Sequence, residues 1–181
     1  MNHADEIWKT LVRATVDKKH PWRVVGFATA GPNGPQVRSV ILRGASESER
    51  QLVFYTDRRS QKIVDLALDA RVSLLFWNSR SNSQLRVTGV AAEETDPERV
   101  AQLWERIPEY SRKDYATLSA PGQVLQDSET GYDMGNARNN FVVLKVEVQS
   151  MELLVLQREG HFRIGLELDA EAHWVENRLV P

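Results

Sequence analysis

The sequence predicts a mainly β protein, an antiparallel β-barrel with peripheral helices, folded as a single domain over residues 1–181. At least six segments have strand composition, and most follow one another as in hairpins, with only a few helical segments between them. No linker, internal repeat or low-complexity tract divides the chain. With 41% hydrophobic and 27% charged residues, the chain is able to bury one sizeable core.

The first elements are a helix and a hairpin. Apolar residues recur at helical spacing from about Asp5 to Lys18, and Pro21 ends this amphipathic helix, which we expect to act as a lid or flank. The segments "WRVVGFATA" and "QVRSVILRGA" have the composition of β-strands. Asn33-Gly34 between them is a strong hairpin signal, because a type I′ turn needs positive φ at both central residues.

Further strands and short helices follow. "QLVFYTD" and "RVSLLFW" are predicted strands, and "RSQKIVDLALDA" between them fits a short helix with Ser60 as its N-cap. "SQLRVTGVAAEE" is a long alternating strand, and Asp96-Pro97 opens a helix that runs through Arg106. A second helical piece is predicted at 109–118, a long loop at 119–139, and strands in "NFVVLKVEVQSMELLVLQ", "HFRIGLEL" and "HWVENRLV".

Composition excludes several classes of function. The 23 Lys and Arg against 25 Asp and Glu give a formal charge of −2, and the cations are dispersed, so no nucleic-acid or membrane surface is indicated. There is no cysteine, and no His or carboxylate cluster has metal-ligand spacing. The first residues do not show the basic start and apolar run of a signal peptide, and no apolar stretch is long enough to span a bilayer. We expect a soluble cytoplasmic protein without a metal.

The segment "YTDRRSQK" has the residues most typical of a ligand-binding site in this sequence. It joins a strand end to a helix start that carries Ser60 and Lys62, which is typical of an anion site because the first helical turn presents unpaired N–H groups. The simpler alternative is a serine cap beside a solvated lysine. Arg38 and Arg43 border the neighbouring strand and favour a local phosphate, although residues five apart on a regular strand point to opposite faces.

Several of these pieces, taken in order, carry a resemblance to a known family. "RSVILR", "YT", "SQK", "RVSLLFW" and Gln84 resemble the FMN-binding split barrels related to pyridoxamine 5′-phosphate oxidase, and "HWVENRLVP" is similar to that family's chain end. "LWERIP" and "APG" look closer to a bacterial oxidase-related subgroup than to the oxidase itself. The resemblance covers nearly the whole chain.

The resemblance implies an antiparallel split β-barrel that binds FMN, forms a homodimer with the flavins at the subunit interface, and takes a small-molecule substrate. The phosphate would be held by Arg38, Ser60 and Lys62, and the backbone of the strand Val40 to Leu42 would run along the ring system. The implied cofactor-binding residues are Arg38, Val40, Ile41, Leu42, Arg43, Tyr55, Thr56, Ser60, Gln61, Lys62, Gln84 and Arg163.

The residues that bind the substrate in the family pattern are only partly present in this sequence. A helix of the oxidases grips the substrate phosphate with a tyrosine, an arginine and a serine; here Arg106 matches, while Gln102 replaces the tyrosine and Ser111 is one place late. A later Arg-x-His-x-Arg motif keeps His161 and Arg163 and has Glu159 first, unless a shift of one residue brings Arg158 there. An expected tryptophan falls at Leu153 or Leu154.

Arg106 and His161 are therefore the candidate substrate-binding residues, and no catalytic residue is assigned. A lone histidine is more often structural or solvated than catalytic, which is the alternative for His161. The favoured function is an FMN-dependent oxidoreductase with an unassigned substrate. The alternatives are a non-catalytic flavin- or haem-related binding protein and a dimeric scaffold that has lost its cofactor.

Overall fold

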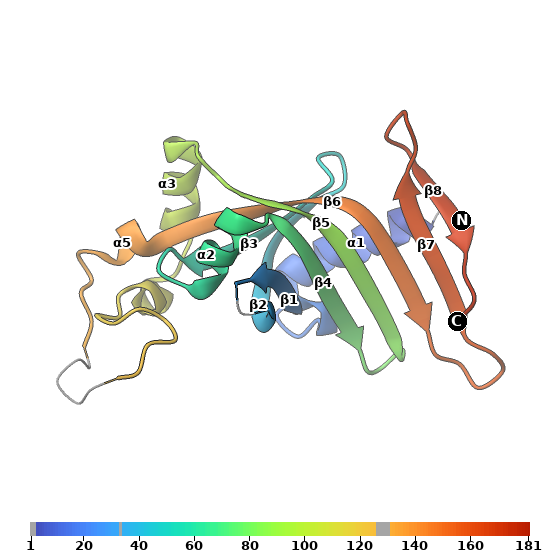
Figure 1. The fold of residues 1–181 in the computed structure, drawn as a ribbon, viewed down its shortest axis with the longest axis horizontal. Coiled ribbons are helices and arrows are strands. Elements are labelled where there is room, and N and C mark those ends of the chain that lie inside the picture. Colours follow the sequence, from blue (N-terminus) through green and yellow to red (C-terminus); the bar gives the residue numbers. More distant parts are fainter. Residues whose placement is uncertain (1–2, 33, 126–130) are drawn as a thin grey trace.

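The computed structural model describes residues 3–32, 34–125 and 131–181, and it confirms a mainly β architecture (Figure 1). The predicted Asn33-Gly34 turn lies partly outside this range, because Asn33 is not among the described residues. The strands are β1 (Val24–Gly31), β2 (Gly34–Ser46), β3 (Gln51–Asp57), β4 (Arg71–Asn78), β5 (Ser83–Glu93), β6 (Phe141–Val155), β7 (Phe162–Leu168) and β8 (Trp174–Arg178). The α-helices are α1 (His3–Val16), α2 (Gln61–Leu68), α3 (Pro97–Glu105), α4 (Glu109–Arg112) and α5 (Ala137–Asn140).

Six antiparallel strands close into a barrel. The sheet order is β3-β2-β1-β4-β5-β6-β7-β8, and an additional pairing between β3 and β6 closes the first six strands of that order on themselves. The 15-residue strand β6 makes this possible, because its first half pairs with β3 and its second half with β7, while β5 pairs along most of its length. Strands β7 and β8 extend the sheet beyond the barrel (Figure 1).

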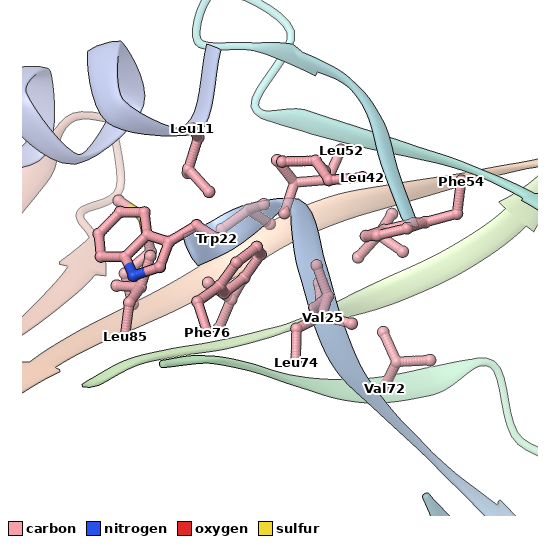
Figure 2. Close-up of a cluster of buried hydrophobic side chains, with 14 of the residues drawn as sticks. Leu11, Trp22, Val25, Leu42, Leu52, Phe54, Val72, Leu74, Phe76 and Leu85 are labelled. Atoms are coloured by element: carbon pink, nitrogen blue, oxygen red, sulfur yellow. The ribbon is translucent and has the colours of Figure 1, made fainter. Parts of the chain in front are cut away.

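The barrel interior is the main hydrophobic core. Alternate residues of each strand point inward, as a period of two requires, and they include Phe27, Leu42, Phe54 and Phe76, all fully buried. Helix α1 packs its apolar face onto this core, and Figure 2 shows Leu11 pointing from the helix toward the barrel residues around Trp22. The amphipathic N-terminal helix predicted from the sequence is thus confirmed as a flank, two residues earlier than expected.

A second, smaller core lies outside the barrel and orders the helices after β5. Trp104 and Tyr115 pack against Phe141 at the start of β6, with ring centroids 5.3 Å from Phe141 in both cases. The helix start predicted at Asp96-Pro97 is confirmed, and Asp96 is its N-cap, because the carboxylate accepts the N–H of Glu98 at 2.9 Å. This cluster fixes α3 over the outer face of β3 and β6.

Several local details differ from the sequence-based expectation. Residues Pro21–Arg23 form a 3-10 turn before β1, and the helical piece expected at 109–118 divides into α4 and a 3-10 turn at Lys113–Tyr115. The expected long loop at 119–139 overlaps the first residues of α5, and its residue Tyr132 forms a β-bridge with Thr117, while its residues 126–130 lie outside the described range. Across the part of the chain that the structure describes, no helix has the length and apolar character needed to cross a membrane.

Candidate functional site

The N-terminal turn of α2 carries a cluster of hydroxyls around an ammonium group. Lys62 Nζ donates to Thr56 Oγ1 at 2.8 Å and to Ser60 Oγ at 3.1 Å, and the two hydroxyl oxygens are 3.2 Å apart. Ser60 occupies the predicted N-cap position, but its side chain makes no capping hydrogen bond, because the hydroxyl is engaged with Lys62 instead. The cluster therefore places a cation where the helix N–H groups are unpaired.

Arg38 reaches the same turn from the inward face of β2. One guanidinium nitrogen, NH1, donates to Thr29 Oγ1 at 2.6 Å, and the other, NH2, lies 3.3 Å from Asp65 Oδ2. Thr29 in turn donates to that Asp65 oxygen at 2.7 Å, and Gln61 donates to the other one at 3.0 Å. Asp65 is fully buried on α2, where its carboxylate is the counter-ion of Arg38, while Lys62 in the preceding turn hydrogen-bonds to the two hydroxyls. We call Arg38, Thr56, Ser60 and Lys62 the cradle.

The charge balance of the cradle suits an anionic group such as a phosphate. Lys62 is half-buried, and desolvation by burial, reinforced by Arg38, lowers its pKa. Among the described residues it forms no ion pair within 4.0 Å, so its ammonium contacts only hydroxyls. A phosphate at a helix N-terminus would supply the missing negative charge. The residues present thus fit the phosphate of a flavin mononucleotide.

A cavity of about 410 Å³ lies on the outer face of the barrel, under α3 and α4. Arg43 enters it from β2, where its guanidinium stacks 5.4 Å from the centroid of the Tyr55 ring. The pairing of β2 with β3 shifts between Leu42 and Gly44, so Arg43 is the extra residue of a β-bulge, a feature that re-aims side chains. The cavity is lined by Thr15, Arg23, Arg43, Gly44, Gln51, Val53, Tyr55, Glu94, Arg99, Leu103, Arg106, Ile107, Pro108, Ser111, Val143 and Lys145.

The cavity wall carries an excess of positive charge. Glu94 is neutralised by Lys145 at 3.1 Å, and Arg23 donates to the carbonyls of Ala14 and Thr15 at the end of α1. The remaining wall cations are Arg43, Arg99 and Arg106, all exposed. Burial raises the pKa of Tyr55, so its hydroxyl stays protonated and is able to donate a hydrogen bond. An organic anion is the ligand class that such a wall favours.

A third group of predicted residues lies across the outer face of β5, β6 and β7. Gln84 pairs with Leu154, and Leu154 pairs with Arg163, so the three residues form one row. The expected tryptophan falls at Leu153 or Leu154; Leu153 packs toward the core, so Leu154 is the outward one of the two. Glu152 holds Arg163 at 2.9 Å and Arg86 at 3.6 Å beside this row.

The structure thus sorts the predicted residues into separate places. Arg38 and Arg43 lie on opposite faces of β2, as their spacing indicated, and serve the cradle and the cavity respectively. Leu42 is buried in the core and Val40 packs against it, so only their backbone is open to a ligand, whereas the neighbouring Ile41 alternates outward. Thr56 and Gln61 belong to the cradle region, and Tyr55 to the cavity.

The two candidate substrate residues are far apart within one chain. Arg106 lines the cavity at the end of α3, whereas His161 is exposed in the turn before β7, where its Nδ1 accepts the N–H of Gln157 at 3.2 Å. Figure 1 shows α3 and β7 at opposite ends of the molecule's longest axis. Glu159 and Arg158 share the exposed turn with His161. Ser111, although out of register in the sequence, lines the cavity with Arg106.

Sequence reasoning missed the buried partner of Arg38. Asp65 is the one charged residue within "IVDLAL", a run that was interpreted only through its apolar positions. A carboxylate inside an apolar helix, three residues after Lys62, was the available signal, because buried acids require partners. The cations Arg23, Arg99 and Lys145 of the cavity were also missed, since they come from elements distant in sequence. The described residues contain no group of three or more His, Asp or Glu placed to hold a metal ion.

Comparison with known proteins gives a consistent family signal. A family model described as pyridoxamine 5′-phosphate oxidase, FMN-binding domain, matches residues 5–93. Curated pyridoxine/pyridoxamine 5′-phosphate oxidases are similar in sequence. That of Novosphingobium aromaticivorans is 35% identical over 141 residues, or 75% of this chain and 66% of the relative. That of Granulibacter bethesdensis is 37% identical over 99 residues, or 48% and 46% of the two chains. The chain spans about half the length of the first curated relatives it matches.

Solved structures share the fold. A pyridoxamine 5′-phosphate oxidase-related FMN-binding protein from Nostoc punctiforme superposes with a TM-score of 0.74 at 24% identity, covering 99% of this chain and 94% of the other. PhzG from Burkholderia lata, in complex with tetrahydrophenazine-1-carboxylic acid, superposes with a TM-score of 0.76 at 18% identity, covering 99% and 93%. The barrel therefore has the split-barrel fold of these proteins.

Proposed function

Because this chain belongs to the pyridoxamine 5′-phosphate oxidase-related family of FMN-binding split-barrel proteins, with FMN as its cofactor, we propose that it is an FMN-dependent oxidoreductase acting on a small organic anion. The observation that carries this proposal is the presence of two separate cationic sites on the two faces of β2, one suited to a phosphate and one to a second anion.

The cradle holds the cofactor's phosphate. Arg38 and Lys62 supply two charge-assisted donors, and Ser60 with Thr56 supplies hydroxyls in the same turn. The remainder of the flavin lies against the outward strand residue Ile41 and the backbone of Val40 and Leu42. The row that contains Gln84 and Arg163 reaches this flavin from a second copy of the chain. Bound FMN supplies hydride exchange with an organic substrate, while the protein supplies binding, orientation and electrostatics.

The cavity on the outer face of β2 and β3 binds the substrate. Arg43, Arg99 and Arg106 attract and orient an anionic group, and the protonated Tyr55 hydroxyl donates to it. The apolar wall that contains Leu103 and Val143 excludes water from the rest of the ligand. A neighbouring protein of the same fold, PhzG, is described with a bound ring carboxylate, which supports a carboxylate-bearing substrate as one candidate class.

We further propose a homodimer in which a second copy brings its His161 and Arg163 toward the site of the first. The two ends of one chain are too far apart to serve one ligand, as the placement of α3 and β7 in Figure 1 indicates. Light scattering of the FMN-loaded protein should give twice the 20.6 kDa mass of the chain. A monomer mass at micromolar concentration would contradict this arrangement.

Anaerobic reduction tests the proposed activity. Purified protein should be yellow, and its flavin absorbance should bleach with a nicotinamide or another organic reductant and return with an acceptor. Protein that binds FMN but is not reduced faster than free FMN in any such screen would favour the flavin-binding role without turnover. Arg106→Met, placed in the cavity and away from the cradle, should slow reduction by the substrate while leaving FMN affinity unchanged.

A further inference from the structure

Asp65 is an unusual residue to find behind a site for a phosphate. Its side chain is fully buried, yet it carries a charge of the same sign as the expected ligand. Burial alone would raise its pKa, but the hydrogen bonds from Thr29 and Gln61, together with the Arg38 charge, hold the pKa below its usual value. The carboxylate is therefore ionised at neutral pH and lies against one of the two cations of the cradle.

The geometry of this contact differs from that of a tight structural ion pair. Arg38 NH2 is 3.3 Å from Asp65 Oδ2, longer than the 2.7–2.9 Å typical of a charge-assisted hydrogen bond. Arg59 and Asp57, in the turn before α2, are paired at 2.7 Å. The shortest contact of Arg38 is instead the one to Thr29 Oγ1, at 2.6 Å. The guanidinium is thus held most closely by a neutral hydroxyl, and more loosely by the carboxylate and by the carbonyls of Phe27 and Gln36.

Asp65 changes the electrostatic balance of the cradle in two opposite ways. Without it, Arg38 and Lys62 would face each other in a partly desolvated turn, and their repulsion would destabilise the cofactor-free protein. With it, one of the two cations has a counter-ion. A phosphate that approaches the cradle gains attraction from both cations but is repelled by the carboxylate behind Arg38, so the same group that stabilises the empty site weakens binding.

We propose that Asp65 is the internal counter-ion of the cradle: it neutralises Arg38 when no phosphate is bound and lowers the affinity for the FMN phosphate, so that the cofactor remains exchangeable. This inference rests on the proposed placement of the phosphate among Arg38, Ser60 and Lys62. Asp65 is assigned no contact with the flavin and acts only through Arg38 and the field of its charge.

Asp65→Asn is a sharp test because it keeps the shape and removes the charge. The amide oxygen is able to accept from Thr29, and the amide N–H₂ is able to donate to a flipped Gln61, so every hydrogen bond retains a partner. Dissociation constants for FMN and for riboflavin, which lacks the phosphate, are measured by fluorescence quenching. We expect FMN to bind about tenfold more tightly and riboflavin to be unchanged, since the field of one buried charge on a phosphate is of this order.

Asp69→Asn is the matched control, because it removes the same charge just beyond the other end of α2, where Asp69 is the C-cap and pairs with Arg71 at the surface. It should leave both affinities unchanged. Weaker FMN binding by Asp65→Asn would overturn the inference, since Asp65 would then be positioning Arg38 rather than competing for it. An unchanged ratio of the two affinities, or an equal loss of both ligands, would overturn it as well.

A second comparison covers the case in which Asp65→Asn alone does not fold. In an Arg38→Gln protein the carboxylate has lost its cation, so adding Asp65→Asn to it should restore part of the lost FMN affinity; no restoration contradicts the inference. Lys62→Met in the same titration separates the two levels of the argument. If that variant leaves the ratio of FMN to riboflavin affinity unchanged, the phosphate placement is wrong; if it lowers the ratio and Asp65→Asn does not raise it, only the counter-ion role fails.

Discussion

Replacing Lys62 by methionine should weaken FMN binding strongly while leaving the fold intact. Within the described part of the chain, the ammonium donates only to Thr56 and Ser60, whose hydroxyl oxygens are 3.2 Å apart and remain able to bond each other when the lysine is gone. The methionine keeps the length of the apolar stem, and a partly desolvated charge disappears. We therefore expect the free energy of unfolding of the cofactor-free protein to change by about 1 kcal/mol or less.

The loss of affinity follows from one missing contact. A charge-assisted hydrogen bond to phosphate is worth about 1.5–3 kcal/mol, which corresponds to roughly tenfold to a hundredfold in the dissociation constant. Riboflavin should bind equally well to both proteins. Titration of cofactor-free protein by flavin fluorescence measures both quantities, and thermal unfolding in the absence of flavin measures the effect on the fold.

Lys9→Met provides the control, because Lys9 is an exposed lysine of α1 and carries the same charge. Equal FMN dissociation constants for the wild type and Lys62→Met would remove Lys62 from the cofactor site. An equal loss of FMN and riboflavin would mean that the lysine supports the turn rather than the phosphate.

Three further outcomes are expected. Burial lowers the pKa of Lys62, so FMN affinity should fall as the pH rises through that lowered pKa and the ammonium loses its charge. The cofactor-free protein should gain stability over the same pH range, because the unfolded chain still holds the proton that the folded chain has lost. Lys62→Met should abolish both trends in pH-dependent titrations. Gly31→Ala should destabilise the protein by about 1–3 kcal/mol in chemical denaturation, because its Cβ would lie 2.6 Å from Asp65 Oδ1; unchanged stability would show that Asp65 moves freely. Peroxide release from pyridoxamine 5′-phosphate should have a kcat/KM about a hundredfold or more below that of a genuine oxidase, because Gln102 and Glu159 replace two phosphate donors; comparable turnover would refute this.

Much of the fold was predictable because its signals are local. The alternation in "RVSLLFW" and "SQLRVTGVAAEE" is a property of consecutive residues, and β4 and β5 follow these segments closely. The helix start at Asp96-Pro97 was also predicted from consecutive residues. The pattern did not predict which strands close the barrel, because the pairing of β3 with β6 joins residues about ninety positions apart. The succession of predicted hairpins indicated a β-barrel, and the family resemblance indicated a split barrel.

The site shows the same division. Ser60 and Lys62 were found from sequence because a helix start with a hydroxyl and a lysine has recognisable spacing. Asp65 was not found, since its role depends on Thr29 and Arg38, which come from two other strands. The bulge at Arg43 also escaped notice, because it arises from a shift in pairing with β3 and has no signature in β2 itself.

The long strand β6 fixes the distance between the cavity and the row of Gln84, Leu154 and Arg163. Its residue Lys145 lines the cavity, and its residue Leu154 lies in the row with Gln84 and Arg163. At about 3.3 Å per residue, the nine steps between them span roughly 30 Å. Hydrogen bonds to β5 on one side and to β3 or β7 on the other keep β6 rigid. No hinge within one chain therefore brings the two ends of β6 together. In the proposed dimer, a ligand that touches both a cavity arginine and an Arg163 would draw them from two different copies, so a change in the length of β6 should alter how the two copies fit around it.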